Sequence, residues 1–179
     1  MDLKVLVVFP DKPALRKVAE QIASGCRVAG AHAEAMAVEK AHHADLAQYG
    51  LVFIGFRATR FSLSSATLRF LREKKQSLSG KPVAAFFTIG AFSGKKPVER
   101  ALQALEAAGT GVKNTLSLHL QGPLSLLGKG HVKSIDLIRA EAFGERTVNY
   151  FTGTRVTKHS EKQAIHGYNK PIQKHQARQ

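Results

Sequence analysis

The stretch with the clearest potential for chemistry is residues 9–14, Phe-Pro-Asp-Lys-Pro-Ala. It joins an apolar run at residues 3–8 to a helical pattern that starts near Pro13. At such a turn the free N–H groups and the positive end of the helix dipole favour a bound anion. Asp11 would repel that anion or cap the helix, whereas Lys12 would attract it. The turn is therefore a candidate phosphate site with two charged residues of opposite effect.

Residue spacing does not support the other common reaction classes. Residues 90–96 resemble a P-loop, but they have one residue too few between the glycines and no Ser or Thr after the lysine. Ser93 does not stand in a Gly-x-Ser-x-Gly run, so no hydrolase elbow is predicted. His42 and His43 lack metal-ligand spacing and are predicted to be solvated loop residues. Cys26, the only cysteine, lies on an apolar helical stripe and is predicted to be buried and unreactive. We therefore predict neither a catalytic residue nor a metal site.

Basic charge is the strongest signal in the composition. The 179 residues include 27 Lys and Arg against 13 Asp and Glu, which gives a net charge of +14. Such a charge concentrates anionic partners near a protein, although it can also serve solubility alone. A candidate partner surface consists of Arg57, Arg60, Lys95, Lys96, Lys129, Arg155 and Lys158. It indicates an acidic protein or RNA as the partner. No signature of base-specific recognition accompanies it.

Hydrophobic periodicity predicts strands that alternate with helices. Continuous apolar runs at residues 3–8, 51–55 and 83–89 are typical of strands buried on both faces of a parallel sheet. Residues 31–38 and 114–120 alternate in polarity and are predicted to be edge strands. Helical stripes follow the strands, and Ser64 or Ser65 can cap one of these helices. The fold class is thus α/β, with a doubly wound parallel sheet of five strands in three layers. Ligands of such sheets bind beyond the strand C-termini, at the topological switch point.

Composition divides the chain into one domain at residues 1–151 and a basic tail at 152–179. The tail holds six Lys and Arg residues against one Glu and few apolar residues. We expect such a segment to be disordered alone and to become ordered only on a partner. No signal-peptide pattern or membrane-spanning run is present in the sequence, so a soluble cytoplasmic protein is expected.

Over residues 1–151 the sequence resembles the flavodoxin-like family. The matching runs are Lys-Val-Leu-Val-Val from residue 4, Lys-Val-Ala-Glu-Gln-Ile from 17, Leu-Val-Phe-Ile-Gly from 51, Leu-Arg-Phe-Leu from 68, Gly-Lys-Pro-Val-Ala from 80 and Leu-Glu-Ala-Ala-Gly from 105. The resemblance implies strand order 2-1-3-4-5 and a seat for FMN. Loop 9–14 would take the phosphate, and loops 56–63 and 90–94 would flank the flavin ring. The implied cofactor contacts are Asp11, Lys12, Ala14, Phe56, Thr59, Phe61, Ser62, Gly90, Phe92 and Ser93.

The phosphate loop departs from the family pattern. Family members usually carry a Ser/Thr-x-Thr-Gly-x-Thr run, whereas residues 10–15 contain no hydroxyl and no glycine. The prolines in this loop also remove N–H donors. Free FMN is therefore expected to bind weakly, if at all. Phe56, Phe61 and Phe92 could face an isoalloxazine ring or could fill hydrophobic gaps beneath the loops, and both interpretations stay open.

Two functions are compatible with these observations. The first is a flavodoxin-like electron carrier or redox accessory protein with weakened FMN binding. The second is a flavin-free basic docking module that binds an acidic protein or RNA. Members of the family usually present an acidic rim around the flavin, so the basic loops of this chain favour a different partner.

Overall fold

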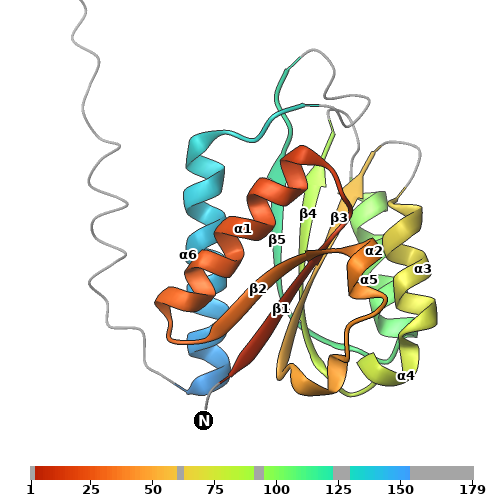
Figure 1. The fold of residues 1–179 in the computed structure, drawn as a ribbon. Coiled ribbons are helices and arrows are strands. Elements are labelled where there is room, and N and C mark those ends of the chain that lie inside the picture. Colours follow the sequence, from red (N-terminus) through yellow and green to blue (C-terminus); the bar gives the residue numbers. More distant parts are fainter. Residues whose placement is uncertain (1–2, 60–62, 91–94, 123–129, 154–179) are drawn as a thin grey trace, which may run out of the picture.

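The computed structural model describes residues 3–59, 63–90, 95–122 and 130–153 of the chain (Figure 1). The elements in chain order are β1 (Lys4–Phe9), α1 (Pro13–Val28), β2 (His32–Ala37), α2 (Val38–Ala41), the 3-10 helix η1 (Leu46–Gln48), β3 (Leu51–Ala58), α3 (Ser65–Glu73), α4 (Lys75–Leu78), β4 (Pro82–Ile89), α5 (Lys96–Ala107), β5 (Gly111–His119) and α6 (Ser134–Thr152). The predicted tail at 152–179 lies outside the described residues except for its first two positions.

The sheet has the order β2-β1-β3-β4-β5, and every neighbouring pair is parallel. This confirms the predicted fold class and strand order. The apolar runs form the three central strands, and the two alternating segments form the edges. The order reverses between β1 and β3, so the switch point lies at the C-terminal ends of these two strands.

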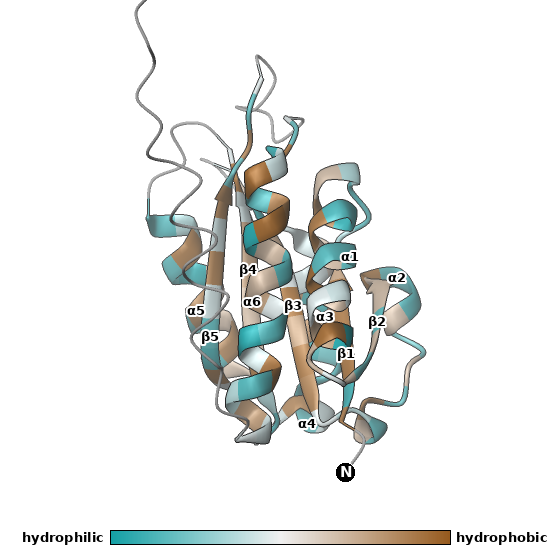
Figure 2. Cartoon of the chain, turned by 90° about the vertical axis from the view of Figure 1, so that its left-hand side faces the viewer, coloured by the Kyte–Doolittle hydropathy of each residue, from teal (hydrophilic) through white to brown (hydrophobic). Residues whose placement is uncertain are grey.

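Helices cover both faces of the sheet (Figure 1). Strand side chains alternate between the two faces, so Val7 and Phe53 join the apolar cluster under α1 and α6. Val8 and Ile54 join the cluster under α2, α3 and α5. Figure 2 shows mostly hydrophobic strands between helices whose outward turns are hydrophilic. The core thus consists of two apolar layers, one on each side of the sheet.

Helices α1 and α6 approach each other through glycines. A Cβ added at Gly144 would lie 2.2 Å from the carbonyl oxygen of Ile22, and one added at Gly25 would lie 1.9 Å from that of Glu141. The Ser24 hydroxyl also donates a hydrogen bond to Glu141 Oε1 at 3.0 Å. Contact at this distance between two helix backbones requires residues without side chains. We call this contact the glycine seam.

Several boundaries differ from the sequence-based prediction. Strand β3 continues to Ala58, because Ala58 still pairs with Ile89 of β4. Residues 56–58, predicted to start a loop, therefore belong to the sheet. Of the two predicted caps, Ser64 is the N-cap of α3 and accepts a hydrogen bond from the Thr67 N–H at 3.4 Å.

Two further predictions concern Cys26 and the membrane. Cys26 is buried as predicted, and burial raises the pKa of its thiol to about 12. This pKa agrees with an unreactive thiol. Within the described ranges, no helix has the length and apolar character needed to cross a bilayer.

Candidate functional site

The turn between β1 and α1 forms the first part of the candidate site. Lys12 is the N-cap of α1, and Pro13 follows it at the start of the helix. The Lys12 N–H donates to the Pro10 carbonyl, and the first helical hydrogen bond runs from the Arg16 N–H to the Lys12 carbonyl. In the described part of the chain the N–H groups of Ala14 and Leu15 have no acceptor. These two groups are the free donors that the helix offers to an anion.

Asp11 does not cap α1, contrary to one of the two roles predicted for it. Its carboxylate instead accepts a hydrogen bond from the Arg16 guanidinium at 2.6 Å, with each side chain about half exposed. This hydrogen bond raises the pKa of Arg16. The ion pair offsets the negative charge that Asp11 would otherwise present to an anion at the turn. Sequence reasoning did not identify this ion pair, for which the only signal is the opposite charge of two residues five positions apart.

Arg57 and Thr88 form the second part of the candidate site. They are paired neighbours on β3 and β4, near the C-terminal ends of both strands. Phe56 and Phe87 precede them and belong to the cluster under α3 and α5. By strand alternation, both Arg57 and Thr88 therefore lie on the face that α1 covers.

Neither residue has a partner in the described ranges. The Thr88 hydroxyl is buried, and it makes no hydrogen bond. The half-buried Arg57 makes no ion pair or hydrogen bond within those ranges. An unpaired buried hydroxyl costs free energy of about 1–3 kcal/mol, so its persistence needs an explanation. A bound anion would satisfy the Arg57 charge, and a polar group that reached the Thr88 hydroxyl, which has no accessible surface in this structure, would satisfy that hydroxyl. Sequence reasoning did not identify Thr88, because a Thr inside an apolar strand gives no signal of lacking a partner.

The aromatic and glycine contacts predicted for a flavin are placed as follows. Phe56 is fully buried and stacks on Phe87 with ring centroids 5.4 Å apart, which agrees with the gap-filling interpretation for this residue. The Gly90 N–H donates to the Ala58 carbonyl and extends the sheet. Thr59 is buried directly after β3. Phe61, Ser62, Phe92 and Ser93 lie outside the described residues.

The basic residues predicted to bind a partner are only partly described. Lys95 and Lys96 are exposed at the start of α5, and Lys12 is exposed at the start of α1. All three stand at the C-terminal edge of the sheet. Arg60, Lys129, Arg155 and Lys158 lie outside the described residues.

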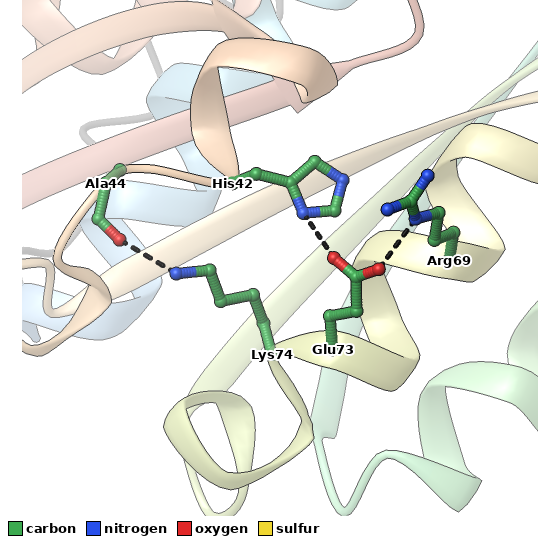
Figure 3. Close-up of polar contacts among 5 residues, drawn as sticks. All are labelled: His42, Ala44, Arg69, Glu73 and Lys74. Carbon is green, nitrogen blue, oxygen red and sulfur yellow. Dashed lines mark hydrogen bonds and ion pairs between the residues drawn. The ribbon is translucent and has the colours of Figure 1, made fainter.

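A separate polar cluster joins α2 to α3, and sequence reasoning did not anticipate it. The Glu73 carboxylate accepts one contact from His42 Nδ1 at 2.8 Å and another from Arg69 Nε at 2.6 Å (Figure 3). The His42 ring packs edge-on against Phe70. His42, the C-cap of α2, is therefore not a solvated loop residue, because its side chain contacts Glu73 and Phe70 of α3. The hydrogen bond from Arg69 holds the pKa of Glu73 below its usual range. No group of three His, Cys, Asp or Glu side chains suited to a metal occurs among the residues that the structure describes.

Comparison with solved structures supports the fold. An archaeal flavodoxin matches with a TM-score of 0.63 and 17% identity, covering 83% of this chain and 98% of that one. The flavodoxin of Megasphaera elsdenii in its two-electron reduced form matches with 0.61 and 20%, covering 81% and 98%. The flavodiiron core Flv1 of Synechocystis matches with 0.66 and 15%, covering 86% of this chain and 37% of that one.

These similarities define the class of fold. The protein has a flavodoxin-like α/β fold with a parallel sheet in the order 2-1-3-4-5. No family model matches the sequence. No curated protein matches it either. The likeness therefore concerns the arrangement of the elements, and function must be argued from the site.

Proposed function

We propose that this protein is a flavodoxin-type redox accessory protein that holds FMN weakly and reversibly at the C-terminal edge of its sheet. The observation that carries the proposal is the pair Arg57 and Thr88. A half-buried cation and an orphaned buried hydroxyl lie side by side on the face that α1 covers. Both groups suit a phosphate or another polar group of a nucleotide.

The residues present fit a phosphate in a way that differs from the family pattern. The free N–H groups of Ala14 and Leu15 would donate to the phosphate, and Arg57 would neutralise it. Thr88 would supply one hydroxyl in place of those missing from loop 10–15. Asp11 is held by Arg16 and opposes the phosphate less than an unpaired carboxylate would. The remaining shortage of donors accounts for weak binding.

The bound flavin would supply the electron-transfer chemistry, and the chain would supply the seat. Thr59 and Lys12 border this seat, while Phe61, Ser62, Phe92 and Ser93 belong to the flanking loops. No catalytic side chain is part of the proposal, since an electron carrier requires none. The protein would pass electrons between partners or deliver FMN to one.

The test compares two flavins that differ in the phosphate. Flavin fluorescence is titrated with FMN and with riboflavin, for the wild type and for Arg57→Gln. We expect a dissociation constant for FMN no tighter than about 1 μM. Arg57→Gln should weaken FMN by about tenfold, because a charge-assisted hydrogen bond is lost, and should leave riboflavin unchanged.

A matched variant controls for net charge. Lys113→Gln removes one positive charge from the exposed surface of β5 and should leave the affinity for both flavins unchanged. Asp11→Asn should tighten FMN severalfold, because it removes a carboxylate from the turn. Equal loss of FMN and riboflavin in Arg57→Gln, or submicromolar FMN affinity that does not depend on Arg57, would contradict the proposal.

A second candidate function is flavin-free docking of an acidic protein or RNA. It is favoured by Lys12, Lys95 and Lys96, which are exposed at one edge and have no ion pair in the described ranges. Binding of RNA should fall linearly with the logarithm of salt concentration, while an acidic protein should give a shallower dependence. If neither RNA nor acidic cell extract shows salt-sensitive binding, the docking function is rejected and the redox function is the one candidate that remains.

A further inference from the structure

An apolar groove runs between α3 and α5, on the face of the sheet opposite the Arg57–Thr88 pair. Its volume is about 540 Å³, within the range of small-molecule sites. Eight residues line it: Ser65, Leu68, Leu71, Arg72, Lys75, Ala104, Ala107 and Ala108. The three alanines leave α5 with little side-chain bulk at this point. The groove therefore reaches down to Leu71 and Ala108, which are buried in the core.

Two unpaired cations stand among the groove's lining residues. Arg72 and Lys75 are exposed, and neither makes an ion pair or hydrogen bond to any residue in the described part of the chain. The nearest carboxylate in sequence is Glu73, which accepts contacts from His42 and Arg69 (Figure 3) and whose pKa the charge of Arg72 also lowers. Lys74 donates to the Ala44 carbonyl at 3.3 Å. Glu73 is not among the residues that line the groove, so this lining contains two positive charges and no carboxylate.

We propose that this groove binds a small anionic amphiphile, with its apolar body along the leucines and alanines and its anionic head at Arg72 and Lys75. The charge complementarity selects a carboxylate, sulfate or phosphate head over a neutral or cationic one. The mostly apolar lining with a few polar groups is the composition typical of a ligand site. This proposal does not depend on FMN binding, because the two sites lie on opposite faces of the sheet.

The size of the groove favours a small ligand over a helical partner. From Ser65 to Arg72 the groove follows α3 for about 10 Å, at 1.5 Å per residue, and Lys75 at the start of α4 continues its lining. A stable protein interface buries about 800 Å² per partner and uses 20 to 30 residues on each side, many more than the eight that line this groove. A single extended aliphatic chain of about ten carbons spans about 11 Å, which is close to the length of the groove along α3.

The experiment uses three probes that share a ten-carbon chain. Decanoate, decanol and decyltrimethylammonium are titrated below their micelle-forming concentrations, by calorimetry and by amide chemical shifts of the full chain. We expect one decanoate per protein, bound at least about threefold more tightly than decanol, with shifts at Leu68 and Ala104. The ammonium compound should bind more weakly than decanol.

Two variants test the two parts of the groove. Arg72→Gln/Lys75→Gln should weaken decanoate by about three- to tenfold and leave decanol unchanged. Its control, Lys17→Gln/Lys113→Gln, removes the same charge from exposed positions elsewhere and should change nothing. Ala107→Phe should block all the probes by filling the groove. Gln103→Phe adds the same ring on α5 at a residue that does not line the groove, and should not block them.

Several outcomes would overturn the proposal. These are no saturable decanoate binding, equal weakening in the two double variants, and decanoate binding that survives Ala107→Phe. Binding of an acidic amphipathic peptide at the same amides, without binding of decanoate, would also overturn it and would assign the groove to a protein partner.

Discussion

The layer under α1 and α6 and the layer under α3 and α5 bury similar strand residues, but their helices pack differently. On the first side, two glycines bring the helix backbones into direct contact along the seam. On the second side, alanines face leucines across a groove of about 540 Å³. Small residues thus have opposite effects in the two layers. Between α1 and α6, the backbone of the opposite helix occupies the space that each glycine leaves. Between α3 and α5, no backbone occupies the space beside the alanines, and a groove remains.

This comparison predicts its largest effect at the seam. Gly144→Ala should lower the free energy of unfolding by about 2–4 kcal/mol, because its Cβ would lie 2.2 Å from a backbone oxygen that cannot rotate away. Urea denaturation measures the change. Gly111→Ala is the matched control, because a Cβ added there would lie 3.6 Å from the side-chain atom Cε of Lys113, which is an ordinary contact. Equal costs for both variants would mean that the seam can relax.

The next prediction concerns the Thr88 hydroxyl, which lacks a partner in the described ranges and lies on the face that α1 covers. Thr88→Val should raise the free energy of unfolding by about 1 kcal/mol, because it replaces an unsatisfied buried hydroxyl with a methyl group of similar size. The same variant should weaken FMN if the proposed seat is correct. Urea denaturation and the flavin titration together separate the two effects. Lower stability would show that the hydroxyl has a partner in the folded protein.

The groove between α3 and α5 should accommodate a larger side chain. Ala104→Leu should change the free energy of unfolding by less than about 1 kcal/mol in either direction, because the new side chain can lie in the groove. Thermal denaturation should therefore give a melting temperature within a few degrees of the wild type. A loss as large as that of Gly144→Ala would show that the groove is closed in solution.

The smallest effect is expected at the cluster of Glu73 with His42 and Arg69. The pKa of Glu73 is lowered in the folded state, so its contribution to stability is present above the unfolded carboxyl pKa. That contribution is lost as the pH falls through the folded pKa. The difference between wild type and Glu73→Gln in urea midpoint should therefore be small at pH 7 and vanish at acid pH. A difference that grows on acidification would contradict this assignment.

The sequence predicted the sheet because its signals were repeated along the chain. Continuous apolar runs such as residues 83–89 marked central strands, and Pro13 marked the start of a helix. The helix packing could not be predicted in the same way. Gly25 and Gly144 are 119 positions apart, and nothing in the local pattern shows that they face each other.

The sequence indicated the edge of the sheet at which the candidate site lies, but not which side chains contact each other there. The turn at 9–14 was located correctly as the start of α1, since a strand followed by a proline gives a clear signal. The Asp11–Arg16 pair depends on side-chain direction, and the isolation of Thr88 depends on what is absent around it. Neither property can be read from residue type. The boundary of β3 was missed because Arg57 interrupts the apolar pattern while the strand continues.

The glycine seam also determines when the domain can become stable during its synthesis. Helix α1 leaves the ribosome before α6, against which it packs and which residues 134–152 form. Until those residues emerge, the surface of α1 that α6 covers faces water, and the first half of the chain cannot bury it. The seam therefore delays completion of the domain until α6 has been synthesised. A nascent chain arrested before residue 134 should consequently be sensitive to protease around α1, and one released beyond residue 153 should be protected there.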